Sequence, residues 1–235
     1  MKEVRPDVEV GGPYVVLSSL DRGEPDGSED VRGPWGVADQ RALDVVEYWL
    51  DHNVGADFLA VDGSTSTRQD TAPDNVTDGA DKFADLTRWL RERSTLPIWW
   101  AEFYPDVPSG EDAAPESSAS AVATLAAVAA YAESGASVAL LWGPQGHGLH
   151  YSALWTDSTQ EDGGQPTPLT AAWQWLVPRL DEGEVEIGRS PTLPLLVFRA
   201  DDGAVVVNPT GDEVQVTPDT EPVPGWAITV TDRSS

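Results

Sequence analysis

The sequence has no cysteine and few cationic residues, and both absences limit what the protein can do. Without cysteine there can be no disulfide framework, no thiol nucleophile and no metal site built on cysteine ligands. The three histidines, His52, His147 and His150, are too few and too dispersed to predict a zinc site, so no bound metal is expected. No apolar run approaches the ~20 residues needed to span a bilayer. The N-terminal stretch also lacks the apolar core of a signal peptide.

The charge balance is strongly acidic. Fourteen Lys and Arg residues face 40 Asp and Glu residues, which gives a formal net charge of -26. Such a surface repels nucleic acid and anionic membranes, so neither is a predicted partner. The only lysines are Lys2 and Lys82, and the acids are scattered along the chain. This pattern favours a solvated acidic surface, as in proteins kept soluble at high salt; the alternative is a high-GC genome with an acidic proteome.

The first part of the chain alternates between apolar runs and segments with helical spacing of apolar residues. The runs are apolar throughout, which indicates parallel strands covered by helices. A doubly wound open sheet and a (β/α)8 barrel both fit this pattern. No Gly-rich phosphate loop joins a strand to its helix, which weakens a nucleotide-binding interpretation. The predicted strands are 8–17, 57–62, 96–101 and 137–142, and the predicted helices are 38–52, 80–93, 120–134 and 167–180.

The connecting segments 18–35 and 145–165 are predicted to be loops, because turn-forming and charged residues dominate them. From residue 183 onward the pattern changes to short strands separated by turns. These strands, at 193–199, 203–208, 213–217 and 226–231, predict a small antiparallel sheet. Such a sheet is too small to be stable alone, so it should pack on the preceding part. We therefore divide the chain into residues 1–182 and 183–235.

The strongest candidate for chemistry is Glu102, in the stretch LPIWWAEFYPD at 96–106. A buried strand delivers this single acid to its C-terminal end, among aromatic residues. In parallel α/β folds that end is where ligands bind. Tyr14, Asp62 and Trp142 lie at the ends of the other three strands. The alternative is an ordinary strand-end carboxylate that caps the next helix or pairs with an arginine.

Five segments together resemble a known family: VRPDVEVGGPY, GADFLAVDG, LPIWWAEF, ALLWGPQG and PTPLTAAWQWL. They are similar to the last four βα units of retaining glycoside hydrolases with a (β/α)8 barrel, in the family 39-like group of β-xylosidases and α-L-iduronidases. The resemblance covers roughly residues 4 to 208. It implies the C-terminal half of a TIM barrel, with four βα units, followed by a small antiparallel β domain.

The resemblance also implies roles for individual residues. Glu102 corresponds to the catalytic nucleophile, and the reaction needs no cofactor. The strand that ends in Asp62 departs from the family, which more often has a histidine and an aromatic residue there. Trp142 would form a stacking floor for a sugar ring, with a core tryptophan as the alternative. The predicted substrate-binding residues are Asp62, Trp142, Tyr104, His147 and Tyr14.

The glutamate that serves as acid/base in the family has no counterpart here. Retaining hydrolysis needs two carboxyl groups ~5 Å apart, and a complete barrel typically takes ~250 residues. We therefore interpret the chain as the C-terminal portion of a longer enzyme, with Met1 as an internal start and any signal peptide on the absent part. By itself it should be inactive or nearly so. The alternative is a non-catalytic carbohydrate-binding or structural half-barrel that associates with an N-terminal half chain or with itself.

Overall fold

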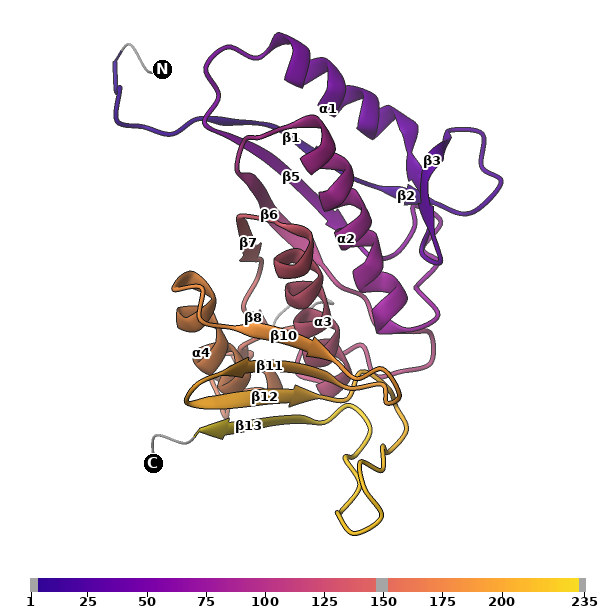
Figure 1. The fold of residues 1–235 in the computed structure, drawn as a ribbon, viewed down its shortest axis with the longest axis vertical. Coiled ribbons are helices and arrows are strands. Elements are labelled where there is room, and N and C mark those ends of the chain that lie inside the picture. The colour runs from indigo at the N-terminus through magenta and orange to yellow at the C-terminus, as the bar shows by residue number, and fades with distance from the viewer. Residues whose placement is uncertain (1–3, 147–151, 233–235) are drawn as a thin grey trace.

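The computed structural model describes residues 4–146 and 152–232. Its centre is a four-stranded parallel sheet in the order β1-β5-β6-β7 (Figure 1). These strands are β1 (Gly11–Val16), β5 (Phe58–Ser64), β6 (Ile98–Tyr104) and β7 (Val138–Leu141). All three strand pairs are parallel, so the prediction from the four apolar runs is confirmed.

Four helices follow the strands: α1 (Gln40–His52), α2 (Val76–Arg93), α3 (Ser118–Ser134) and α4 (Pro168–Asp181). Helix α2 begins four residues before its predicted start, because the Asn75 side chain accepts a hydrogen bond from the backbone N–H of Asp78 at 2.8 Å. Such a side-chain acceptor satisfies one of the free N–H groups of the first turn. Gly135 ends α3 in a left-handed conformation at φ 89°.

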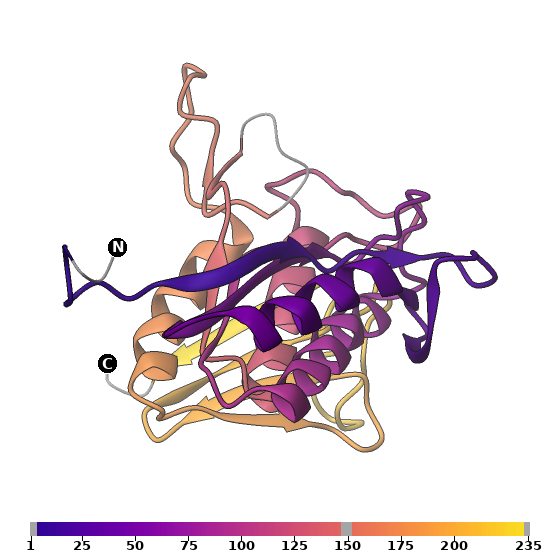
Figure 2. The same ribbon diagram turned by 90° about the horizontal axis from the view of Figure 1, so that it is seen from above.

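The helices cover one face of the parallel sheet, and Trp100 of β6 shows how. It is fully buried, donates a hydrogen bond to Thr87 of α2 at 2.9 Å, and meets the rings of Phe83 and Tyr131. Its neighbour Trp99 stacks on Phe58 of β5 with ring centroids 4.1 Å apart. The two tryptophans therefore take opposite faces, as strand alternation predicts. Figure 2 shows α1 and α2 on one side of the strands and the loop between residue 152 and α4 projecting to the other.

The prediction of a loop over residues 18–35 is wrong. This segment and the residues after it form a three-stranded antiparallel sheet, β2 (Ser19–Leu20), β3 (Gly27–Gly33) and β4 (Gly36–Asp39), in the order β2-β4-β3. Charged side chains, Glu29, Asp30 and Arg32, fill the exposed positions of β3 and hide its strand character in the sequence. Buried Trp35 anchors the sheet to α2 through a 3.0 Å hydrogen bond to Asp85. The predicted loop 145–165 likewise contains the two-residue strands β8 (Gln145–Gly146) and β9 (Trp155–Thr156).

The predicted C-terminal antiparallel sheet is confirmed, with corrections to its strands. Its order is β10-β11-β12-β13, with β10 at Glu186–Arg189, β11 at Leu196–Ala200, β12 at Gly203–Val207 and β13 at Ile228–Asp232. The polar strand β10 was not predicted. The predicted strand 213–217 makes only an isolated bridge, Val214 to Val223. Prolines follow Val214 in this segment and prevent a continuous ladder. The sheet packs on α4, where Arg179 binds Asp202 at 3.1 Å.

Candidate functional site

Glu102 is partly buried near the C-terminal end of β6. Its Oε1 accepts a hydrogen bond from the phenol of Tyr14, and its Oε2 accepts one from the phenol of Tyr104. The structure therefore brings together three residues that the sequence analysis selected from two different strands. In the part of the chain that the structure describes, Glu102 has neither of the two alternative roles, a helix cap or a partner of an arginine. Within residues 4–146 and 152–232 no arginine pairs with Glu102, and the next helix, α3, is capped by Ser117. Two phenol donors fix the orientation of a single carboxylate.

Tyr14 reaches Glu102 because the backbone of β1 is irregular at this residue. Tyr14 has φ 56°, and the register between β1 and β5 shifts between Pro13 and Val15. Bulges of this kind redirect a side chain. A positive φ at a residue other than glycine costs about 1–3 kcal/mol, and such strained backbone conformations are typical of functional sites. Its hydrogen bond to Glu102, followed by burial and the charges of Glu102 and Asp62, raises the pKa of Tyr14 to about 12. The phenol is thus a donor at neutral pH.

Asp62 lies beside Glu102 at the end of the neighbouring strand. The two residues are register partners in the β5–β6 pair, just after a register shift. Asp62 is only 7% exposed. Burial, and then the negative charge of Glu102, raise the pKa of Asp62 to about 6. The site therefore contains two carboxyl groups, one of which holds its proton more strongly than an ordinary aspartic acid.

The other predicted substrate-binding residues are less closely grouped. Trp142 follows β7 and is 51% exposed, so it is not a core tryptophan. His147 lies outside the described residues. No group of three or more acidic or histidine side chains is placed to hold a metal ion in the described parts of the chain. Nor is any helix there long and apolar enough to cross a bilayer.

Lys82 is a residue near the site that the sequence analysis missed. It lies on α2, is fully buried, and donates hydrogen bonds to Ser19 Oγ at 2.8 Å and to the carbonyl oxygen of Ser64 at 2.6 Å. Burial lowers the pKa of Lys82 to about 7, against a smaller opposing effect of Asp106. It joins β2 to the end of β5, two residues beyond Asp62. The sequence held one signal of this burial: Lys82 lies four residues before Leu86 and therefore on the apolar face of α2.

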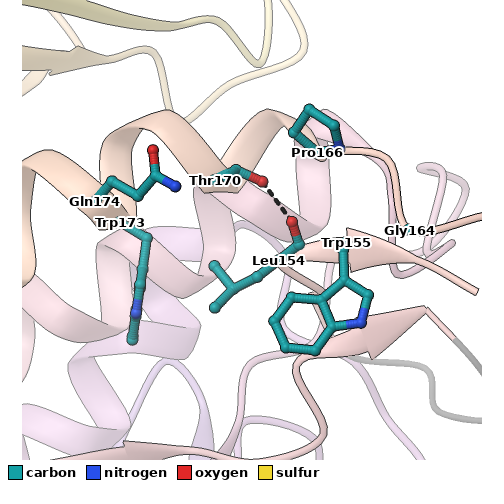
Figure 3. A pocket seen from close by; sticks show the side chains of 7 residues that line it. All are labelled: Leu154, Trp155, Gly164, Pro166, Thr170, Trp173 and Gln174. Carbon is teal, nitrogen blue, oxygen red and sulfur yellow. Dashed lines mark hydrogen bonds between the residues drawn. The ribbon is translucent and has the colours of Figure 1, made fainter. Parts of the chain in front are cut away.

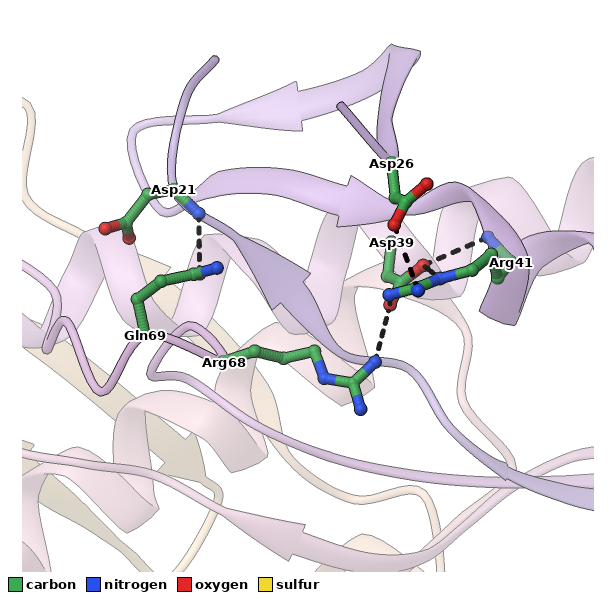
Figure 4. A network of polar contacts seen from close by, with 6 residues as sticks. All are labelled: Asp21, Asp26, Asp39, Arg41, Arg68 and Gln69. Atoms are coloured by element: carbon green, nitrogen blue, oxygen red, sulfur yellow. Dashed lines mark hydrogen bonds and ion pairs between the residues drawn. The ribbon is translucent and has the colours of Figure 1, made fainter. Parts of the chain in front are cut away.

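An ion-pair network holds the loop that follows β5 (Figure 4). The Asp39 side chain, 3% exposed, caps α1 and pairs with Arg41 at 2.7 Å and Arg68 at 2.8 Å. Arg41 also pairs with Asp26 at 2.9 Å. Hydrogen bonding from Arg41, only partly opposed by burial and supported by Arg68, lowers the pKa of Asp39 to about 2. The network ties the start of α1 to the segment downstream of Asp62, so its role is structural.

A separate pocket lies between α4 and the segment before it (Figure 3). Its volume is about 230 Å³, and Thr170 donates a hydrogen bond to the carbonyl oxygen of Leu154 at its wall. Glu102 and Asp62 do not line it. The residues that line it are Leu154, Trp155, Gly164, Pro166, Thr170, Trp173 and Gln174.

Comparison with known proteins gives a fold and no closer relationship. No family model matches the chain, and no curated protein matches it. Among solved structures, a glucosidase from Croceicoccus marinus matches with a TM-score of 0.50 and 18% identity, over 94% of this chain and 47% of that chain. A monomeric beta-xylosidase from Caulobacter crescentus CB15 has a TM-score of 0.47 and 13% identity, over 94% and 42% of the two chains.

The chain thus has a glycoside hydrolase-like fold, in which a parallel sheet with helices is combined with an antiparallel sheet. It spans less than half the length of the glucosidase and the beta-xylosidase that it matches. At these identities the likeness concerns the fold alone.

Proposed function

We propose that this chain is the C-terminal part of a retaining glycoside hydrolase, with Glu102 as the nucleophile. The observation that carries the proposal is the position of Glu102, at the C-terminal end of a parallel strand and held through both carboxylate oxygens by Tyr14 and Tyr104. The strands follow one another across the sheet in sequence order and the helices cover one face. This arrangement favours half of an eight-stranded barrel rather than a doubly wound sheet, because a doubly wound sheet has helices on both faces.

In the proposed reaction a carboxylate oxygen of Glu102 bonds to the anomeric carbon of a sugar as the bond to the leaving oxygen breaks. A proton from an acid outside these 235 residues goes to that leaving oxygen. Water then attacks the anomeric carbon of the glycosyl ester and gives a proton to the same group, now a base, which frees Glu102. Tyr14 and Tyr104 hold the carboxylate in the attacking orientation, and no cofactor takes part.

The remaining site residues would bind the sugar. Trp142 offers an exposed indole face on which the apolar face of a pyranose can stack. Asp62 lies beside the nucleophile, where sugar hydroxyls would be within reach. Tyr104 donates a hydrogen bond to Glu102, and His147, which follows β8 in the sequence, is proposed as a contact from the sequence alone.

Covalent trapping tests this proposal without the missing acid. A 2,4-dinitrophenyl 2-deoxy-2-fluoro-β-xyloside has a leaving group that needs no protonation, and its fluorine slows hydrolysis of the glycosyl ester. Intact mass spectrometry should show one fluoroxylosyl adduct on the wild-type chain, and peptide mapping should place it on Glu102. Glu102→Gln should not react, whereas Glu92→Gln, on an exposed part of α2, should react like the wild type. An adduct on another residue would contradict the assignment.

A second candidate function is a non-catalytic half-barrel that binds a partner chain. The observation that favours it is the apolar character of the sheet face away from the helices, where the Phe58–Trp99 stack lies. Exposed Val16 and Leu140 add to it at the two edge strands, β1 and β7. Open apolar edges invite association. Sedimentation velocity distinguishes the cases, because a stable monomer with one cooperative melting transition argues against an obligate partner.

A further inference from the structure

The carboxyl group of Asp62 has no hydrogen-bond partner among residues 4–146 and 152–232, although the residue is only 7% exposed. Its backbone carbonyl accepts from the N–H of Leu17, but that bond does not involve the side chain. In the described chain, the fully enclosed side-chain atoms without a hydrogen-bond partner belong to Tyr131, Ser152 and Trp175, so the carboxyl oxygens of Asp62 keep access to solvent. A carboxyl group that no protein group binds, at the ligand-binding end of a strand, is open to a hydrogen bond with a ligand.

The neighbours of Asp62 do not supply that partner. Both phenols of the site are engaged by Glu102, Tyr14 on Oε1 and Tyr104 on Oε2. The charged or titratable groups that act on Asp62 are Glu102 on β6 and Tyr14 on β1, and no cation of the described chain contributes. Neighbouring strands lie about 4.8 Å apart, so Asp62 and Glu102 stand side by side on one face as register partners. Two carboxyl groups in this arrangement are not readily ionised together.

We propose that Asp62 keeps its proton in the binding-competent site and donates a hydrogen bond to a hydroxyl oxygen of the sugar that lies over Glu102. The identity of the ligand as a sugar rests on the proposed function. The pKa of Asp62, raised to about 6, supports this state at mildly acidic pH. When Asp62 ionises, the donor is lost and a second negative charge stands beside Glu102. Sugar binding therefore weakens as the pH rises through this range.

The test measures the affinity for methyl β-D-xyloside, and for methyl β-D-glucoside as a second probe, at pH 5 and pH 8 by NMR chemical-shift perturbation. At pH 8 only about 1% of a group with a pKa of 6 is protonated. The wild type should therefore lose up to about 100-fold in affinity between the two pH values. Asp62→Asn carries an amide donor at every pH and should bind with a pH-independent affinity. Asp62→Ala should bind weakly at both.

A titration without sugar gives a second measurement. The ¹³C carboxyl shift of Asp62 should titrate near pH 6 in the wild type and at lower pH in Glu102→Gln, which removes the neighbouring charge. Affinity that is constant or rises with pH in the wild type, or Asp62→Asn that binds as poorly as Asp62→Ala, overturns the inference. If Glu102 is trapped covalently but sugar binding gives either of these two contradicting results, only the inference about Asp62 fails. If neither trapping nor binding occurs, the proposed function fails.

Discussion

Tyr14 on β1 donates its phenolic hydrogen bond to Glu102 on β6, although strand β5 lies between the two strands. The contact joins residues 88 positions apart in the sequence. It depends on the left-handed backbone of Tyr14, which turns the side chain across the sheet. The orientation of Glu102 is therefore set from the edge of the sheet as well as from its own strand.

We expect Tyr14→Phe to slow the covalent trapping of Glu102 by up to about 100-fold, because a reacting group that is misplaced by about 1 Å can lose this much in rate. The measurement is the rate of adduct formation by mass spectrometry. Tyr48→Phe is the matched control, because Tyr48 is an exposed residue on α1 that contacts His52 rather than the site. Equal trapping rates for the wild type and Tyr14→Phe would show that Tyr104 alone orients Glu102.

Trp142→Ala should weaken binding of methyl β-D-xyloside by about 3- to 10-fold, since a stacked indole contributes on the order of 1 kcal/mol. The free energy of unfolding should change by less than about 0.5 kcal/mol, because half of the side chain is exposed. Trp155→Ala is the comparison, because this exposed tryptophan lines the separate pocket beside α4. A larger loss of affinity in Trp155→Ala would move the sugar site to that pocket.

Asp39→Asn should lower the free energy of unfolding by about 2 kcal/mol at pH 7, because the amide keeps a capping oxygen but loses the charge that pairs with two arginines. The folded pKa of Asp39, about 2, lies below its ordinary value of 3.8. Its stabilisation is therefore complete above the ordinary pKa and is lost as the pH falls through the folded pKa. Urea denaturation should show a smaller difference in the free energy of unfolding between the wild type and Asp39→Asn near pH 2 than at pH 7. Asp51→Asn, on the exposed side of α1, should show no such difference at either pH.

Lys82→Met should remove a pH dependence of stability at alkaline pH. The folded pKa of Lys82, about 7, lies below its ordinary value of 10.5. Between these values the unfolded chain binds the extra proton, so this lysine makes the free energy of unfolding rise with pH, by at most about 1.4 kcal/mol per unit. Urea midpoints from pH 7 to pH 10 should rise less steeply in Lys82→Met than in the wild type. Arg88→Met, at an exposed position on α2, should keep the wild-type slope.

The parallel sheet could be predicted because its strands are apolar on both faces and thus stand out in the sequence. Glu102 could be placed at a strand end for the same reason. Strand β3 could not be predicted, because charged residues occupy its exposed positions and Val31 is its only large apolar residue. Its pairing is stabilised by β4 and by the distant contact of Trp35 with α2, neither of which is a local signal.

Two features of the site also escaped sequence analysis. The backbone of Tyr14 takes a conformation that tyrosine disfavours, so only the pairing of β1 with β5 could reveal it. Lys82 is buried against the general preference of lysine for the surface. Its partners, Ser19 and the carbonyl oxygen of Ser64, come together only when β2 and β5 are in place.

The burial of Lys82 has a practical consequence for labelling. The chain has two lysines, Lys2 and Lys82, and these are its only side-chain amines. In the folded protein Lys82 is fully buried. Acylating reagents should therefore modify Lys82 only in molecules that have opened around α2. The extent of its acylation, measured by mass spectrometry, would report the fraction of those molecules and therefore the local unfolding around α2, β2 and the end of β5.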